Sequence, residues 1–360
     1  MIEFYNEQVK TYIERKQWDK ELQVENFVDN DQTKISWTSS LKNFLKRHIE
    51  MHFFPRNVVS AMYRPFCKNC LYFDEYLNHG VFLMPRIFPE PELENVAISV
   101  CGKGGSKDFS PFIHDLLFDL NVQEACAQCF PFYTYEPVES KSKNLIEADG
   151  ERVGNYIRRE NISDAILQKF QEHYADRRIT KEDIFYYVYG ILHSRSYRER
   201  FAADLKKQLP RIPMVDDFQA FSQAGRNLAE LHLNYESGKM YSLKEIVTGT
   251  LNLKVEQMKY PKMGKNTDKS RIIYNSTLTL DGIPPETYKY VVNGKSALDW
   301  IVERYAITPD KKGKSGIVND PNDWCEECGN ERYIIDLVKR VVHLSVESVK
   351  IIEGLPELTF

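Results

Sequence analysis

Apolar positions between residues 180 and 236 recur at helical spacing and predict three consecutive helices. Thr180 stands three residues ahead of Asp183, an arrangement typical of the capping box that begins a helix. A second helix is expected after Ser196, and Pro210 and Pro213 end it because proline interrupts a helix. The third carries an apolar face. Short amphipathic helices bury such faces only by packing together, so we expect a helical bundle here. The apolar positions of the three helices are Ile184, Tyr187, Val188, Ile191 and Leu192; Tyr197, Phe201, Leu205 and Leu209; and Phe218, Phe221, Leu228 and Leu231.

The first 150 residues show a different pattern. Residues 1–30 open with a helical stripe, and short apolar runs broken by Asn, Gly and Pro follow between 71 and 100. We expect strands in LYFD, VFLMPRIF and NVAISV, and the prolines around the middle run confine it to a sheet edge or a loop. Residues 136–160 are polar and rich in turn-forming residues, which is typical of a domain boundary.

The remaining C-terminal residues combine strands with helices. Alternation in LKVEQMKY and RIIYNSTLTL predicts two or three antiparallel strands. An amphipathic helix is expected over 288–305 with Ser296 as its N-cap, and a periodic helix is expected over 333–352. The sequence therefore predicts an α+β fold with two lobes. They are a β-rich lobe with an N-terminal linking helix over 1–150, and a mainly helical lobe over 151–360 with a small antiparallel sheet at about 245–285.

Charge is balanced overall but not locally. The chain of 360 residues has a formal net charge of −4, which by itself indicates neither a nucleic-acid tail nor an acidic disordered segment. Between Lys34 and Cys70, however, the cations face a single acid, Glu50, and aromatic side chains alternate with them. Cations among aromatic and short polar side chains favour contact with DNA phosphates and grooves, and the alternative is a solvated cationic face without a partner. The cations are Lys34, Lys42, Lys46, Arg47, Arg56, Arg64 and Lys68.

Two further segments are candidates for phosphate contact. The run CGKGGSK follows an expected strand, and its Lys103, Ser106 and Lys107 suit a phosphate cradle, although the P-loop spacing is absent and a hairpin turn explains it equally well. The loop between the expected C-terminal strands is also basic, and its alternatives are a solvated hairpin tip or a surface for an acidic neighbouring domain. Its candidates for DNA contact are Lys262, Lys265 and Lys269.

The seven cysteines include three CxxC pairs, Cys67 with Cys70, Cys126 with Cys129, and Cys325 with Cys328. Two such pairs are able to build a tetrahedral zinc site, but the gaps between these pairs are far longer than in a zinc ribbon. We therefore predict no metal, with a zinc-stapled scaffold as the alternative. An odd cysteine count without a secretory signal favours a reducing cytoplasm.

No recognisable catalytic motif appears in the sequence. A G-x-G-x-x-G loop, a Walker lysine, a G-x-S-x-G elbow and an H-E-x-x-H helix are all missing, and no convincing PD-(D/E)-x-K nuclease signature is present. The acidic pairs Asp216–Asp217 and Glu326–Glu327 are expected to cap helices or solvate the surface. We therefore predict that the chain is not catalytic by itself.

Several long phrases of the chain resemble one family. They are YRPFCKNCLYFD, QCFPFYTYE, KEDIFYYVYGILHS, LPRIPMVDDFQAFSQAGRNLAELHLNYE, YKYVVNGKSALDWIVERY and SGIVNDPNDW, in this order. Together they resemble the C-terminal specificity portion of the Type ISP restriction–modification enzymes, single polypeptides that cut and methylate DNA. The resemblance also implies that the chain is a fragment or an excised domain, since a methyltransferase domain precedes this portion in the family.

The resemblance implies sequence-specific recognition of double-stranded DNA. The target adenine would be presented to a methyltransferase domain of the same polypeptide. S-adenosylmethionine, ATP and magnesium are expected only in the rest of the full-length enzyme, and no membrane association is expected. The first candidates for DNA contact are Lys42, Lys46, Arg47, Arg56, Arg64 and Lys68, and the second are Lys103, Ser106 and Lys107. The alternatives are a non-catalytic interaction scaffold, with or without zinc, and an enzyme whose site is not recognised.

Overall fold

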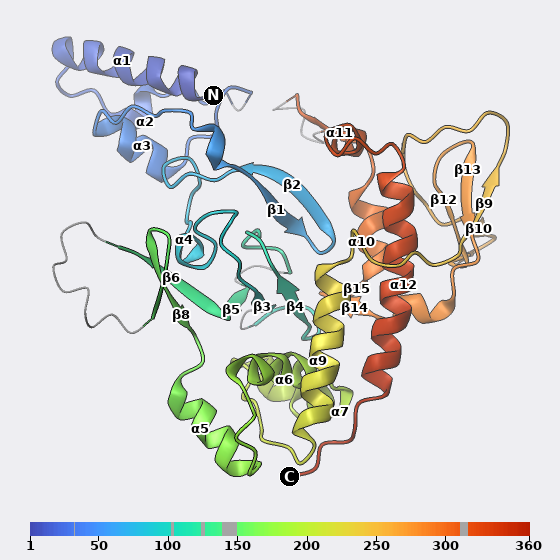
Figure 1. Ribbon diagram of the computed structural model, residues 1–360. Coiled ribbons are helices and arrows are strands. Elements are labelled where there is room, and N and C mark those ends of the chain that lie inside the picture. The colour runs from blue at the N-terminus through green and yellow to red at the C-terminus, as the bar shows by residue number, and fades with distance from the viewer. Residues whose placement is uncertain (32, 102–103, 124–126, 139–149, 310–315) are drawn as a thin grey trace. The chain divides into compact units, whose positions relative to one another are not determined.

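The computed structural model describes residues 1–31, 33–101, 104–123, 127–138, 150–309 and 316–360. Helices and small sheets of two or three strands are mixed along these residues, so the predicted α+β class is confirmed (Figure 1). The chain forms two compact units. Unit 1 comprises 1–60, 70–83 and 307–320, and unit 2 comprises 61–69, 84–306 and 321–360. This grouping differs from the lobes 1–150 and 151–360 expected from the sequence, which stay a prediction.

Unit 1 is built around its first helix, as the opening stripe of the sequence predicts. Tyr5 and Val9 are fully buried against Leu45 in one apolar cluster. The Tyr5 hydroxyl donates to the Ile49 carbonyl (3.1 Å), and the Asn6 side chain exchanges two hydrogen bonds with the Met51 backbone (2.7 and 2.8 Å). These bonds fix the chain that leads to the strands. The elements are α1 (Ile2–Trp18), α2 (Val24–Phe27), α3 (Ser39–Lys46), η1 (Pro55–Asn57), the hairpin β1 (Val58–Arg64) and β2 (Cys67–Tyr72) whose tip belongs to unit 2, β16 (Thr308–Pro309) and β17 (Val318–Asn319).

Helix α3 ends in a left-handed residue that is not glycine. His48 has φ 60°. The His48 amide donates to the Leu45 carbonyl (3.0 Å), and the Ile49 amide donates to the Phe44 carbonyl (3.0 Å). This is the Schellman arrangement, in which glycine is preferred because it lacks the Cβ that makes the left-handed region unfavourable.

Replacing His48 with glycine is therefore expected to stabilise the protein. The expected gain in unfolding free energy is up to about 1 kcal/mol. A shift of the urea unfolding midpoint to higher concentration checks it. A lower midpoint for His48→Gly would contradict this expectation. It would show that contacts of the imidazole stabilise the protein by more than the left-handed backbone at residue 48 destabilises it.

The N-terminal part of unit 2 holds two three-stranded antiparallel sheets. In the first, β3 (Ala97–Val100) lies between β4 (Pro111–His114) and β5 (Gln128–Pro131), with Val100 opposite Pro111. In the second, β8 (Tyr156–Glu160) lies between β6 (Tyr133–Pro137) and β7 (Glu151–Val153). The expected strand in 95–100 is confirmed. The expected strand in 81–88 is wrong, because a short helix, α4 (Met84–Ile87), forms there with Pro85 in its first turn.

The helices expected between residues 180 and 236 are present with one correction. Helix α6 (Lys181–His193) begins with the predicted capping box, in which the Asp183 amide donates to the Thr180 hydroxyl (3.1 Å). The second helix is shorter than expected and divides at Phe201, and Ser194 rather than Ser196 caps it. The elements of this part are α5 (Asp164–His173), α7 (Arg195–Arg200), α8 (Ala202–Leu205) and α9 (Phe218–Leu233).

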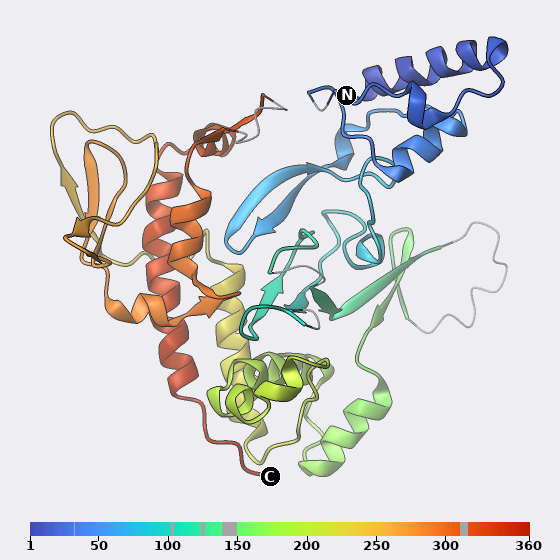
Figure 2. The same cartoon turned by 180° about the vertical axis from the view of Figure 1, so that it is seen from behind.

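Two long helices, α9 and α12 (Tyr333–Glu353), lie side by side in unit 2, and the small C-terminal sheet lies on the other side of α12 (Figures 1 and 2). This sheet has the order β12 (Arg271–Ile273), β13 (Leu278–Asp281), β9 (Lys244–Val247), so the strands expected in RIIYNSTLTL are confirmed. The strand expected in LKVEQMKY is wrong, because this segment forms only isolated bridges at Gln257 and Lys259.

Ser296 caps the next helix as predicted, accepting from the Asp299 amide (3.1 Å). The helix expected from Tyr288 begins only at Ala297, because a short pair of strands forms over 291–296. The remaining elements are β10 (Lys262–Met263), β11 (Asn266–Thr267), η2 (Pro285–Lys289), β14 (Val291–Val292), β15 (Lys295–Ser296), α10 (Ala297–Arg304) and α11 (Pro321–Glu327).

Candidate nucleic-acid interface

Helix α3 presents cations beside its buried face. Thr38 caps the helix, with its hydroxyl accepting from the Leu41 amide (3.1 Å). Leu41 and Leu45 point into the core of unit 1. The helical period therefore turns Lys42 and Lys46, four residues apart, away from that core. Lys42 is half-buried, whereas Lys46 and the following Arg47 are exposed.

Arg56 lies in a second cationic segment of unit 1. It occupies the short turn η1, whose first residue is Pro55, and its side chain is exposed. The guanidinium lies 5.7 Å from the centre of the Phe54 ring, within the range of a cation–π contact. This contact holds the side chain near the surface without neutralising its charge.

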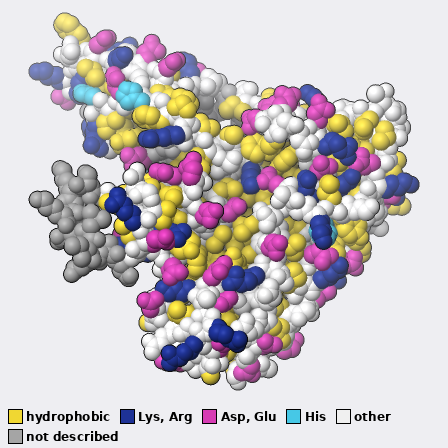
Figure 3. Space-filling model, viewed as in Figure 1, with side chains coloured by type: hydrophobic (Ala, Val, Ile, Leu, Met, Phe, Trp, Pro, Cys, Tyr) yellow, Lys and Arg dark blue, Asp and Glu magenta, His cyan; other side chains and the backbone are white. Residues whose placement is uncertain are grey.

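Four of the cations predicted in unit 1 form no ion pair in the part of the chain that is described. Over the residues that the structure describes, no carboxylate lies in salt-bridge distance of these side chains, although Lys34 nearby pairs with Asp29 (2.7 Å). On the visible face of the protein, Lys and Arg are mixed with Asp and Glu (Figure 3). Unit 1 therefore contains cations available to an anionic partner. They are Lys42, Lys46, Arg47 and Arg56.

Arg64 and Lys68 lie at the tip of the β1–β2 hairpin and have partners inside unit 2. Arg64 pairs with Asp119 (2.9 Å) and lies 4.1 Å from the centre of the Tyr63 ring. Lys68 pairs with Glu236, and both side chains are mostly buried. The two residues hold distant parts of unit 2 together, so they are less available for phosphate contact than the four cations of unit 1.

The glycine-rich segment connects two antiparallel strands, as a hairpin turn requires. It runs from β3 to β4, and the Gly104 amide donates to the Lys206 carbonyl (3.2 Å), so this amide is not free for a phosphate. Ser106 and Lys107 are exposed, and the methylene chain of Lys107 lies against Gly294. Lys103 lies outside the described residues.

The three predicted lysines of the C-terminal insert differ in their surroundings. Lys262 and Lys265 are exposed on the small β10–β11 hairpin. The Lys269 ammonium pairs with Asp299 (3.1 Å), and it lies 5.2 and 4.5 Å from the ring centres of Tyr260 and Tyr288. The charge of Lys269 is thus balanced within the protein although its side chain is 45% exposed, whereas the other two lysines face solvent.

The cysteines do not gather into a ligand set in the part of the chain that is described. Burial raises the pKa of the Cys67 thiol to about 11 and that of Cys129 to about 12, which disfavours the thiolate that zinc binds. Cys126, the partner of Cys129 in its CxxC pair, lies outside the described residues. Among those described, no three His, Cys, Asp or Glu side chains are placed to hold a metal ion.

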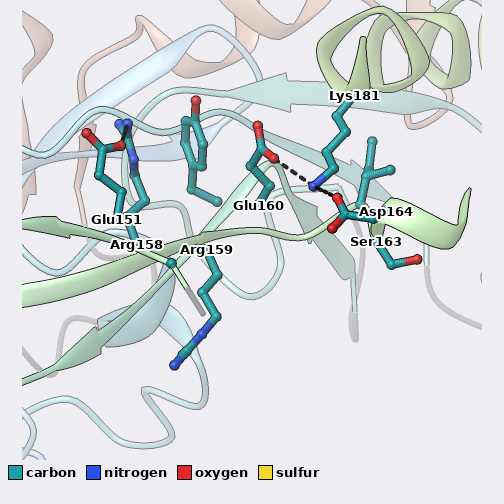
Figure 4. Close-up of a pocket in the computed structure, with 10 residues that line it drawn as sticks. Glu151, Arg158, Arg159, Glu160, Ser163, Asp164 and Lys181 are labelled. Carbon is teal, nitrogen blue, oxygen red and sulfur yellow. Dashed lines mark hydrogen bonds and ion pairs between the residues drawn. The ribbon is translucent and has the colours of Figure 1, made fainter. Parts of the chain in front are cut away.

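One cavity of about 520 Å³ lies between β8 and the start of α5 (Figure 4). Its charged side chains have ion-pair partners, Arg159 with Glu136 outside the cavity lining. The Lys181 ammonium contacts Glu160 (2.8 Å) and Asp164 (2.6 Å), and Arg158 pairs with Glu151. The hydrogen bond to Asp164, followed by that to Glu160, raises the pKa of Lys181, so this amine stays protonated and is not a base or nucleophile.

The sequence interpretation overlooked an aromatic surface beside Arg56. Phe53 and Phe54 are 58% and 45% exposed, and the Phe53 ring stacks on Tyr72 with 5.3 Å between ring centres. The run HFFPR contains the available signal: two consecutive Phe residues directly before a proline turn have no helix or strand period to bury both of them.

Among the described residues, no helix has the length and hydropathy that crossing a membrane requires. A comparison with curated proteins finds no match.

Comparisons with known families and structures agree with one another. Residues 1–337 match the Type ISP C-terminal specificity domain. The whole chain is similar to part of a nuclease-deletion mutant of the Type ISP restriction–modification enzyme LlaGI in complex with a DNA substrate mimic, at 34% identity and a TM-score of 0.82, covering 100% of this chain and 30% of that one. It is also similar to the ATP-dependent Type ISP enzyme LlaBIII bound to DNA, at 32% identity and a TM-score of 0.83, covering 100% of this chain and 21% of that one. A third similar structure is DrdV in a complex with DNA, with 30% identity, a TM-score of 0.82 and coverage of 100% of this chain and 33% of the other. This chain therefore spans a third or less of those polypeptides, and it belongs to the family of Type ISP C-terminal specificity domains.

Proposed function

We propose that this chain recognises a short double-stranded DNA sequence as the target-recognition part of a Type ISP restriction–modification polypeptide. It presents the target adenine to a methyltransferase domain elsewhere in that polypeptide, which flips the base out of the helix. S-adenosylmethionine, ATP and magnesium are used by the other domains. The cytoplasm is the expected location.

The observation that carries the proposal is the set of unpaired cations in unit 1, in a chain that matches three DNA-bound enzymes over its whole length. Cations on phosphates fix the position of a protein on the duplex, and base-edge contacts then read the sequence. Lys42, Lys46, Arg47 and Arg56 are the proposed phosphate contacts. Arg64 and Lys68 are proposed to hold the hairpin in place, since their charges are already paired with Asp119 and Glu236.

The segments predicted as secondary contacts remain secondary in the proposal. Ser106 and Lys107 are exposed beside a loop whose Gly104 amide is already bonded, and Lys262 and Lys265 are exposed on a two-residue hairpin. These residues are proposed to contact the DNA backbone or a neighbouring domain of the polypeptide.

A non-catalytic role for the chain alone is supported by its chemistry. The lysine of the cavity beside α5 is held protonated by two carboxylates, and its arginines, Arg158 and Arg159, pair with Glu151 and Glu136. Catalytic sites instead leave an acid, base or nucleophile free to react with a substrate. We therefore propose that the chain supplies binding and specificity and that the chemistry takes place elsewhere.

Binding to a labelled duplex across a salt series tests the phosphate contacts. The plot of log affinity against log salt has a slope of about −0.9 per phosphate contact. Removing two contacts with Arg47→Ala and Arg56→Ala is expected to make the slope shallower by about 1.8. Fluorescence anisotropy measures it.

Lys254→Ala is the matched control. This lysine is 71% exposed, but Glu326 already balances its charge (3.4 Å). The slope of this variant is expected to equal that of the wild type. If Lys254→Ala and the double variant change the slope by the same amount, binding depends on overall charge. That result would contradict the proposed contacts.

A further inference from the structure

The exposed aromatic surface of unit 1 is built with a fixed geometry. The Tyr72 hydroxyl donates to the His52 carbonyl (3.2 Å) and accepts from the Phe54 amide (3.1 Å). The Phe53 and Tyr72 rings stack at an angle of 20°. One face of Phe53 is thus covered by Tyr72, while the side chain as a whole is 58% exposed. We call His52, Phe53, Phe54, Arg56 and Tyr72 the aromatic platform.

Leaving this platform in water is unfavourable unless a partner covers it. Two adjacent exposed Phe rings expose apolar area whose burial contributes about 25 cal/mol per Å². Tyr72 is held by two hydrogen bonds, so the platform has little conformational freedom to lose when a partner binds. Its rigidity and exposure together indicate a binding surface.

The charge around the platform selects an anionic partner. Arg56 lies over Phe54, and Lys42, Lys46 and Arg47 lie in the same unit without carboxylate partners among the described residues. Between Lys34 and Phe73 the sequence contains only one acid, Glu50; Asp74 and Glu75 follow directly, and Asp74 accepts from the side chain of Asn57 (3.4 Å), the residue after Arg56. Such a field suits an anionic partner, and aromatic rings among cations are the composition that binds nucleic-acid strands, through base stacking and phosphate contact.

An intact duplex cannot use the free face of a ring in this way. Base faces in a duplex are covered by neighbouring base pairs, so a protein ring stacks only on a base that has left the stack. We propose that the aromatic platform binds an unpaired, unstacked base of the DNA, with Phe53 as the stacking ring and Arg56 on the adjacent phosphate. This proposal deepens the proposed function and rests on it.

The test compares two duplexes of one sequence, one fully paired and one with a short unpaired bubble that contains the fluorescent adenine analogue 2-aminopurine. The full chain is expected to bind the bubble at least about fivefold more tightly, since stacking of one base on an aromatic ring contributes about 1–3 kcal/mol. Binding is also expected to quench the fluorescence of the analogue, because stacking does so.

The variant Phe53→Ala is expected to lose both the preference for the bubble and the quenching while it keeps its affinity for the paired duplex, because the Phe54 ring under Arg56 remains. Phe53→Leu retains apolar volume without a flat ring and is expected to lose the quenching as well. Trp18→Ala is the control, because this side chain is 90% exposed in the same unit but lies at the end of α1.

The outcomes separate this inference from the proposed function. Equal wild-type affinity for the two duplexes, or a quenching that survives in the Ala variant, overturns the platform as a base-binding surface and leaves DNA recognition intact. Loss of paired-duplex binding in the Ala variant overturns it too, and it would place the platform on the duplex itself. Failure of the wild type to bind either DNA overturns both proposals.

Discussion

Gly190→Ala and Gly225→Ala are each expected to lower the free energy of unfolding by roughly 3 kcal/mol or more, at the upper end of the range for overpacked cores. The two glycines lie where α6 and α9 touch backbone to backbone. A Cβ on Gly190 would stand 2.1 Å from the Phe221 carbonyl oxygen, and one on Gly225 would stand 1.8 Å from the Tyr186 carbonyl oxygen. Because both obstacles are helix backbone, side-chain rotation gives no relief and the helices must separate.

The separation would also disturb neighbouring contacts of the same helix pair. The Ser222 hydroxyl donates to the Asp183 carbonyl (2.9 Å), and Arg226 pairs with Asp183 (2.7 Å). Urea unfolding followed by far-ultraviolet circular dichroism measures the change.

Gly354→Ala is the matched control for these variants. Gly354 ends α12 with φ −85°, and a Cβ there would lie 3.3 Å from the nearest atom, the Lys350 carbonyl oxygen. Its free energy of unfolding is expected to change by less than about 1 kcal/mol. The close approach of α6 and α9 would be contradicted if Gly190→Ala and Gly225→Ala unfolded at the same urea midpoint as the control.

The second large effect is a loss of stability in mild acid. Burial lowers the pKa of His114 to about 3. Burial, followed by the charge of Arg198, lowers the pKa of His193 to about 3. Burial and the neighbouring His193 hold the pKa of His232 well below its ordinary 6.5. The hydrogen bonds of the three rings go to hydroxyl groups or to a backbone carbonyl, as in the pair between His232 Nε2 and the Ser348 hydroxyl (3.0 Å).

The sign follows from proton binding. Below pH 6.5 the unfolded chain binds protons at these three positions and the folded chain does not, so their contribution to stability is complete above pH 6.5 and is lost progressively toward pH 3. At pH 5, His114 and His193 are each expected to have removed about 2 kcal/mol, and His232 acts in the same direction. Since native proteins have only about 5–15 kcal/mol of stability, a marked loss of stability by pH 5 is expected.

Urea midpoints between pH 7.5 and 5 test this expectation, in a range where ordinary carboxyl groups stay ionised. His193→Gln removes one site of proton uptake on unfolding. Its free energy of unfolding is therefore expected to fall less steeply with falling pH, by the slope that corresponds to one proton. His173→Gln, at the exposed end of α5, controls for the substitution itself. A pH dependence that His193→Gln leaves unchanged would contradict the assignment of the proton uptake to the buried rings.

Local signals in the sequence predicted local structure well. The Thr180 and Asp183 pair marked the start of α6, Ser296 marked the start of α10, and the apolar period marked α12. Each depends on residues within one or two helical turns, so the sequence contains the whole of the relevant chemistry. The strand expected in 81–88 was wrong because its apolar run lacks a clear period, and the helix expected after Ser196 was too long because no glycine or proline marks its division at Phe201.

Which cations of the candidate interface have an acidic partner depends on long-range contacts that sequence spacing does not reveal. Lys42 and Lys68 look alike in the sequence, yet Lys68 pairs with Glu236, 168 residues away, while Lys42 has no acid partner among the described residues. Arg64 likewise meets Asp119 across 55 residues. Composition identified the basic segment, but the fold decides which of its charges are still available to DNA.

The most direct test of DNA recognition is selection from a randomised duplex pool. The purified chain is incubated with the pool at several salt concentrations, and the retained DNA is sequenced. Enrichment of one short asymmetric motif, lost in an Arg47→Glu/Arg56→Glu variant, is the predicted result. Retention of DNA without any enriched motif would mean that the chain holds only the backbone and contradicts recognition by the chain alone, and no retention even at low salt would contradict DNA binding itself.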